Sequence, residues 1–174
     1  AFCGLGRNLA TTGSLEPDAR TLALTTIHRF VTLAERMGVV HLAMVATAAV
    51  REAADGAEFV AAVERICGVP LKIISGKAEA HYAALGVMSG TRELDGVIGD
   101  LGGGSLELIL IRKGSIAESV SLPLGALRLL DAHGSDVRAA SQAIDEAFNG
   151  LEWWNKLSGA QLYAVGGNWR ALAR

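Results

Sequence analysis

Residues 97–111 read VIGDLGGGSLELILI, and this stretch constrains the fold more than any other part of the chain. One apolar run precedes three consecutive glycines and a second apolar run follows them. This pattern predicts two paired strands joined by a tight turn. Asp100 precedes the glycines, and Ser105 and Glu107 follow them. The stretch therefore predicts either a glycine-rich hairpin with solvated acids or a loop that binds phosphate.

The first half of the chain alternates helix and strand patterns. Helices are expected at 14–38, 52–67 and 77–87, with strands between them at 39–46 and 70–75. The strand at 39–46, VVHLAMVA, is continuously apolar and rich in β-branched residues, so we expect it to be buried on both faces. This order of elements indicates parallel strands joined by crossover helices.

The pattern changes near residue 95. Three strand-like runs with short glycine-containing turns predict an antiparallel meander, followed by helices at 124–133 and 136–157, a strand at 161–165 and a final helix. The shift in composition at 89–96 places the expected boundary between a first lobe, 1–94, and a second lobe, 95–174. We expect an α/β protein of two lobes, with a mixed sheet flanked by helices and a cleft between the lobes.

Composition excludes several classes of function. The formal net charge is -2 with no block of like charges, which argues against nucleic-acid binding by bulk charge. No apolar run approaches the roughly 20 residues that span a membrane. Cys3 and Cys67 lack the spacing of a metal or redox motif, which favours reduced thiols and a cytoplasmic location.

Consecutive glycines after a strand let the backbone approach a ligand closely and turn its N–H groups towards an anion. An aspartate at the strand end, Asp100, is suited to hold Mg²⁺ through water, because that ion keeps much of its hydration. Ser105 adds a hydroxyl donor, and Glu107 either reaches the same pocket or points outward from its strand.

Three further segments follow expected strands. They place Arg51 after the first strand, Glu79 in the first turn of a helix after the second, and Gly166 and Gly167 between the last strand and helix. Ligands bind at the carboxyl ends of strands in open α/β sheets. We therefore expect these junctions and the glycine stretch to converge on one edge of one sheet.

Four segments occur in an order and spacing that resemble a known family: ATAAVREA (46–53), ISGKAEAH (74–81), GDLGGGSLEL (99–108) and VGGNWRALA (165–173). The family is the exopolyphosphatase and guanosine pentaphosphate phosphatase (Ppx/GppA) family. It belongs to the actin-like ATPase, sugar kinase and Hsp70 superfamily, whose core resembles ribonuclease H. The resemblance implies a Mg²⁺-dependent hydrolase that releases terminal orthophosphate from polyphosphate, guanosine pentaphosphate or both.

The resemblance also implies a role for each candidate residue. Glu79 would be the general base that activates water, and Asp100 and Glu107 would hold the metal. Phosphate would be bound by Arg51, Gly102, Gly103, Gly104 and Ser105, and Gly166 and Gly167 match the nucleotide-side loop of the superfamily.

The chain departs from the family pattern in places. The family's first phosphate-binding segment is absent, so the chain resembles an internal fragment, for which we expect homodimerisation. Leu106 stands where the family has Thr, and Lys77, Ala78 and His81 depart from the more acidic, arginine-ended form around Glu79.

Other interpretations remain open from the sequence. Glu79 could serve only as a helix cap. The chain could belong to a kinase of the same superfamily, a non-catalytic module that binds phosphorylated nucleotides, or an actin-like assembly domain.

Overall fold

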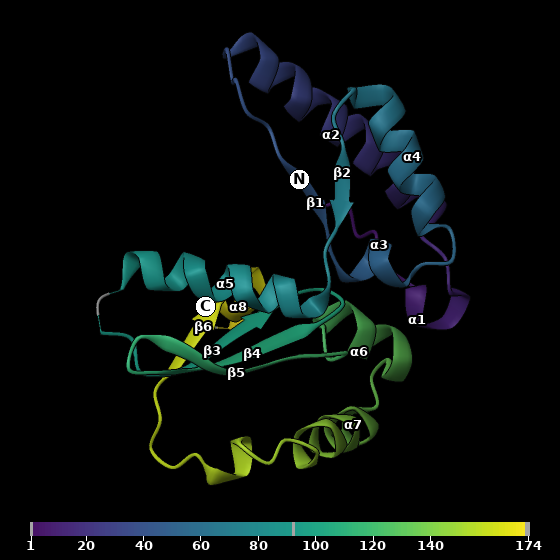
Figure 1. The fold of residues 1–174 in the computed structure, drawn as a ribbon. Helices are drawn as coiled ribbons and strands as arrows, with labels where there is room; N and C mark the ends of the chain where they lie inside the picture. The colour runs from purple at the N-terminus through teal and green to yellow at the C-terminus, as the bar shows by residue number, and fades with distance from the viewer. Residues whose placement is uncertain (1, 92, 173–174) are drawn as a thin grey trace. The chain divides into compact units, whose positions relative to one another are not determined.

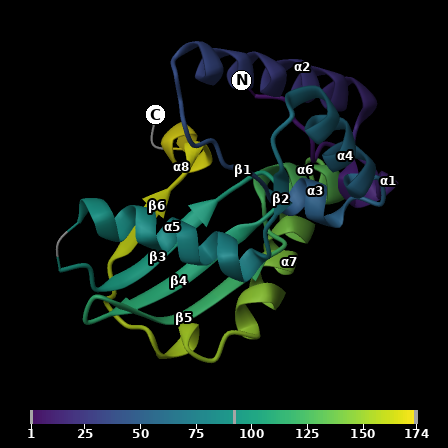
Figure 2. The same ribbon diagram turned by 45° about the horizontal axis from the view of Figure 1, so that its top comes forward.

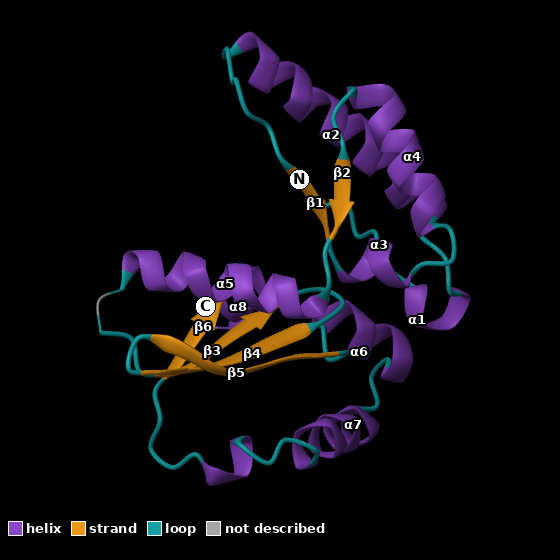
Figure 3. Ribbon diagram, in the orientation of Figure 1, coloured by secondary structure: helices purple, strands orange, loops and turns teal. Residues whose placement is uncertain are grey.

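The structure is a computed structural model that describes residues 2–91 and 93–172. The chain forms two compact units, one within residues 1–75 and one within 76–174, and each contains a sheet flanked by helices (Figures 1 and 3). The change of composition predicts a boundary near residue 95, whereas the contacts divide the chain before Gly76. The reason is that the helix at 76–90 packs on the sheet of the second unit.

The first unit holds two short parallel strands and four helices. Met44 pairs with Leu71 and Ala46 with Ile73 across the two strands. Its elements in chain order are α1 (Leu9–Thr12), α2 (Pro17–Arg36), β1 (Met44–Ala46), α3 (Ala48–Glu52), α4 (Gly56–Cys67) and β2 (Leu71–Ile73).

Helices α2 and α4 form the core of the first unit. Ala23 and Val31 of α2 pack with Phe59 and Val63 of α4, at the spacing that puts side chains on one helix face. The Glu16 side chain accepts a hydrogen bond from the Ala19 N–H, so Glu16 rather than Ser14 is the N-cap of α2. Helix α4 ends at Gly68, which has a left-handed conformation.

Two expectations for this unit are wrong. Strand β1 covers only Met44–Ala46, and Val40 and Val45 are exposed, because β1 pairs on one edge and packs on one face. The helix expected at 52–67 starts late, at Gly56, after a separate short helix, α3, that ends at Glu52. Asp55 is held by α2, since it accepts from the Leu15 N–H at 2.9 Å and pairs with Arg20 at 3.0 Å.

The second unit is built on a four-stranded mixed sheet in the order β5-β4-β3-β6. Strands β3, β4 and β5 form the expected antiparallel meander, and β6 adds parallel to β3. The elements are α5 (Gly76–Gly90), β3 (Gly96–Leu101), β4 (Leu106–Arg112), β5 (Ser115–Leu122), α6 (Ala126–His133), α7 (Val137–Asn149), a 3₁₀ turn (Trp154–Lys156), β6 (Leu162–Val165) and α8 (Gly167–Leu172).

Helices cover both faces of this sheet. Helix α5 lies across β3, β4 and β5, where Ala80 and Ala84 meet Ile98, Ile109 and Ile111 (Figure 2). The opposite face carries Leu106, Leu108 and Leu110, which pack with Ile144 and Phe148 of α7 and with Trp153 and Trp154. Burial on both faces explains why β3 and β4 are apolar almost throughout.

The helix expected at 136–157 is shorter than predicted. Helix α7 ends at Asn149 with Gly150 as its C-cap. Trp153 and Trp154 lie at the start of the 3₁₀ turn, and their rings pack edge to face. None of the helices among the described residues is long and apolar enough to span a membrane.

Candidate functional site

The glycines 102–104 form the turn of the β3–β4 hairpin. The Gly102 N–H donates to the Ser105 carbonyl at 3.0 Å, which closes the turn after the last paired residues, Leu101 and Leu106. The Ser105 side chain is buried, so its hydroxyl faces the interior of the unit and not the solvent.

The amino end of helix α6 fixes this turn. The N–H of Ala126 donates to the Gly102 carbonyl, and the N–H groups of Leu127 and Arg128 donate to the Gly103 carbonyl, at 2.9–3.1 Å. The Arg128 Nε donates to the Gly104 carbonyl at 2.9 Å. The turn therefore satisfies the N–H groups that a helix leaves unpaired in its first turn.

Because the carbonyls of the turn point to α6, its other N–H groups are left for a ligand. Within the described residues, the N–H groups of Gly103, Gly104 and Ser105 donate to no protein acceptor. Three successive N–H donors without a Cβ at two of the positions are suited to an anion. The hairpin interpretation and the phosphate-loop interpretation are thus compatible, since the same turn can be both.

Asp100 and Glu107 lie directly opposite each other in the β3–β4 register. Opposed residues of an antiparallel pair project from the same face, and this face is the one that α5 covers, together with Ile98 and Ile109. Glu107 is only 2% exposed, which excludes an outward-pointing, solvated side chain. Ser121 of β5 donates to Glu107 Oε1 at 2.7 Å.

Glu79 approaches the same two carboxylates from α5. It precedes the buried Ala80 and lies in the first turn of the helix. Its negative charge raises the pKa of both Asp100 and Glu107. Glu79, Asp100 and Glu107, which are at most 28 residues apart in sequence, thus lie close enough to influence one another electrostatically, and their roles stay predictions.

The electrostatics of this cluster disfavour full ionisation without a cation. Burial is the main cause that raises the pKa of Asp100, and the Glu79 charge adds to it. Burial also raises the pKa of Glu107, against the hydrogen bonds from Ser121 and Ser105, which lower it. Grouped carboxylates with raised pKa values are common at functional sites.

The donor set suits a hard cation such as Mg²⁺, which prefers carboxylate oxygens and water. Asp100 and Glu107 supply two carboxylates on one face of the sheet. Among the described residues, no group of three or more His, Cys, Asp or Glu side chains could hold a metal ion by itself. A cation here would therefore complete its coordination with water and substrate oxygens.

The β6–α8 junction packs directly against Asp100. Gly166 has a φ of +106°, and a Cβ there would come within 3.0 Å of Asp100 Oδ1. The Asn168 side-chain amide donates to the carbonyls of Leu101 and Gly102, and Trp169 Nε1 donates to the Gly99 carbonyl, at 2.9–3.0 Å. Gly167 begins the helix. This junction holds β3 and its glycine turn in place.

Arg51 belongs to the first unit. It lies in α3 after β1, and its Nη1 donates to the Ile74 carbonyl at 2.8 Å. The expectation that all junctions lie on one sheet edge is wrong, because β1 and β2 form a sheet of their own. Within the second unit the expectation holds for β3 and β6, whose parallel carboxyl ends carry Asp100 and Gly166.

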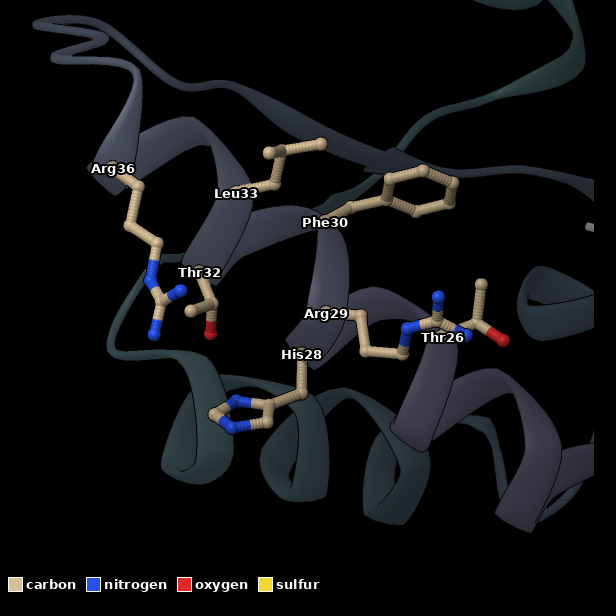
Figure 4. A pocket seen from close by; sticks show the side chains of 7 residues that line it. All are labelled: Thr26, His28, Arg29, Phe30, Thr32, Leu33 and Arg36. Carbon is tan, nitrogen blue, oxygen red and sulfur yellow. The ribbon is translucent and has the colours of Figure 1, made fainter.

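A separate hollow of about 610 Å³ lies along α2. Figure 4 shows His28, Thr32 and Arg36, which are four residues apart and lie on one side of the helix, with Phe30 and Leu33 on the other. None of the residues that line it is among the candidate residues. The hollow therefore does not belong to the candidate site.

Several residues whose contacts fix the candidate site could not be assigned from the sequence alone: Ser121, Gly125, Arg128, Asn168 and Trp169. A Cβ at Gly125 would overlap the backbone of Gly103 and Gly104, so the start of α6 needs glycine there. The segment GGNWR was visible as a motif, but its Asn and Trp reach carbonyls about 70 residues earlier in the chain. Only the folded structure shows those contacts.

Comparison with known proteins agrees with this arrangement. A family model described as the Ppx/GppA phosphatase family matches residues 3–170. An exopolyphosphatase from Cytophaga hutchinsonii is 26% identical with a TM-score of 0.90, over 99% of this chain and 59% of that chain. The Aquifex aeolicus member of the Ppx/GppA family is 25% identical with a TM-score of 0.68, over 96% of this chain and 56% of that one.

The chain thus spans less than two thirds of the length of these similar structures. Their similarity confirms the expected α/β fold of the actin-like ATPase type. Together with the match over nearly all of its residues, it shows that this chain belongs to the Ppx/GppA phosphatase family.

Proposed function

We propose that the protein releases terminal orthophosphate from inorganic polyphosphate, guanosine pentaphosphate or both, in a Mg²⁺-dependent hydrolysis. One observation carries this proposal: Glu79, Asp100 and Glu107 interact electrostatically beside a glycine turn that has unpaired N–H groups. A phosphoanhydride hydrolase needs these parts, namely a base for water, a metal site and donors for phosphate oxygens.

Each part has a defined task in the proposed reaction. The N–H groups of Gly103, Gly104 and Ser105 bind oxygens of the terminal phosphoryl group. Asp100 and Glu107 would hold Mg²⁺, which would supply positive charge beside that group. For Arg51, which belongs to the first unit, the role of a phosphate ligand stays a prediction from the family resemblance alone.

Glu79 acts as the general base. It accepts a proton from water as the water oxygen forms a bond to the terminal phosphorus atom. The bridging P–O bond then breaks, and its electron pair stays on the shortened chain, which leaves as an anion. Proton transfer to a positioned carboxylate contributes about 10²- to 10⁴-fold to the rate.

The substrate class is supported by the similar exopolyphosphatase and by the family description. We propose a cytoplasmic location, because Cys3 and Cys67 lack the spacing of a metal or redox motif.

The test is release of orthophosphate from long-chain polyphosphate and, separately, from guanosine pentaphosphate. We expect release with Mg²⁺, loss of release with EDTA, and recovery when excess Mg²⁺ is added. Phosphate transfer to an acceptor without release of orthophosphate would identify a kinase instead. Binding of either compound without turnover would identify a non-catalytic module.

A further inference from the structure

The carbonyl of each glycine in the β3–β4 turn accepts a hydrogen bond from outside the turn. Backbone N–H groups of α6 donate to the carbonyls of Gly102 and Gly103, and the Asn168 amide also donates to the first of these. The Gly104 carbonyl accepts instead from a charged side chain, the guanidinium of Arg128, through Nε at 2.9 Å.

A hydrogen bond to one of these carbonyls also fixes the N–H group of the following residue. The two groups belong to one planar peptide unit, and in a trans peptide they point in opposite directions. None of the described peptide bonds is cis. The bond from Arg128 to the Gly104 carbonyl therefore sets the direction of the Ser105 N–H, which points away from the guanidinium.

The Ser105 N–H is one of the three donors that the turn offers to an anion. Because Gly103 and Gly104 have no Cβ, the backbone before Ser105 has a wide range of conformations to choose from. A peptide unit that is free to rotate must be ordered when the ligand binds, and this lowers the affinity. A peptide unit already held by its carbonyl presents its N–H without that cost.

The position of Arg128 in its helix is unusual for a cation. It is the third residue of α6, so it lies in the first turn, where the helix dipole disfavours positive charge. Helix stability therefore does not favour an arginine here. A charged donor does, however, polarise the peptide that it binds, and this strengthens the N–H at the other end as a donor.

We propose that Arg128 is a positioning residue, which holds the peptide between Gly104 and Ser105 so that the Ser105 N–H is directed at a phosphoryl oxygen before the ligand arrives. Arg128 acts through this peptide and not by contact of its guanidinium with the ligand. The inference rests on the proposed function for the identity of the ligand as a phosphate.

Two substitutions separate the hydrogen bond from the charge. The amide nitrogen of glutamine is as many bonds from Cα as the Nε of arginine, so Arg128→Gln retains a neutral donor. Arg128→Met places a methyl group there. With pyrophosphate and Mg²⁺ in the Glu79→Gln background, Arg128→Met should raise the dissociation constant about three- to tenfold, as for a lost hydrogen bond. Arg128→Gln should retain most of the affinity.

The amide resonances of the turn give a readout that general loss of stability would not give. In the ¹⁵N-labelled protein, pyrophosphate should shift the resonances of Gly103, Gly104 and Ser105. In Arg128→Met the shift of Ser105 should be strongly reduced. The shift of Gly103 should remain, because its N–H shares a peptide with the Gly102 carbonyl, which keeps its own donors.

Arg138→Met is the matched control, because Arg138 is an exposed arginine in the first turn of α7, in the same unit. It should bind pyrophosphate normally. Equal losses of affinity in Arg128→Gln and Arg128→Met, or an equal reduction of all three shifts in Arg128→Met, would overturn the positioning role. A loss confined to Ser105 in a protein that releases no orthophosphate would refute the hydrolase but keep this role.

Discussion

At the residue scale, the surroundings of Asp100 disfavour the negative charge of its carboxylate. Burial and the Glu79 carboxylate raise its pKa. An acid whose pKa rises on folding stabilises the folded state below its ordinary pKa, and this contribution is lost as the pH rises through the raised value. At neutral pH, without a cation, ionised Asp100 therefore reduces the free energy of unfolding.

Asp100→Asn should accordingly stabilise the metal-free protein. Measured by thermal unfolding in EDTA, Tm should rise at pH 7 by about 2–4 °C, the change that roughly 1 kcal/mol gives in a chain of this size. The difference from the native protein should shrink as the pH falls and Asp100 takes up a proton. A lower Tm at pH 7 would contradict the account.

Asp95→Asn is a control for which the opposite change in Tm is expected at pH 7. The Arg112 side chain and the Lys113 N–H donate to Asp95 and lower its pKa. Its contribution is present above the ordinary pKa and is lost as the pH falls through the lowered value. Asp95→Asn should therefore lower Tm at pH 7, and the difference should vanish in acid.

Single residues also show what the sequence could and could not predict. The motifs led to Glu79, Asp100 and the glycines, because acids and glycines at strand ends are recognisable locally. The direction of Glu107 stayed open, since Leu106, Leu108 and Leu110 alternate with Glu107, Ile109 and Ile111 and both sets are largely apolar. Both sets are buried, because helices cover both faces of the sheet.

At the element scale, contact between the glycine turn and α6 decides the geometry of the phosphate donors. Gly125→Ala places a Cβ into the backbone of Gly103 and Gly104. We expect a loss of about 1–3 kcal/mol in the free energy of unfolding, as for other overpacked sites. Affinity for pyrophosphate should fall as well, because the turn must move.

Gly86→Ala is the matched control for this substitution. Gly86 lies in the interior of α5, and a Cβ there would meet no atom within 4 Å. Replacing a glycine by alanine in a helix stabilises by about 0.5–1 kcal/mol. Chemical denaturation of both variants measures the contrast, and equal stabilities would show that the turn and α6 do not pack as described.

Elements were predictable where local pattern and packing agree. The meander was correctly expected because its runs are separated by glycine turns, and α5 because of its alanine-rich pattern. The break between α3 and α4 depends on Asp55, which bonds to a residue 40 positions earlier. The late start of the strand expected at 39–46, which begins only at Met44, depends on how few strands pair there. Neither cause is local in sequence.

At the scale of the whole molecule, the two units differ in how completely the apolar side chains of their sheets are buried. In the second unit the central strands β3 and β4 are buried on both faces. The first unit exposes apolar side chains of and near β1, including Val40, Val45 and Met37. Exposed apolar surface of this kind favours association, so homodimerisation stays a prediction.

The measurement that tests the account most directly is orthophosphate release by Glu79→Gln. With saturating long-chain polyphosphate and Mg²⁺, kcat should fall about 10²- to 10⁴-fold, because the base is lost. Binding of the substrate should change little. Glu58→Gln is the matched control, since Glu58 is also an acid in the first turn of a helix, and it should be fully active.

A pure capping role for Glu79 would lower the stability of Glu79→Gln and leave the rate of the folded enzyme intact. The account therefore predicts loss of release in Glu79→Gln alone. Equal orthophosphate release by Glu79→Gln, Glu58→Gln and the native protein would contradict it.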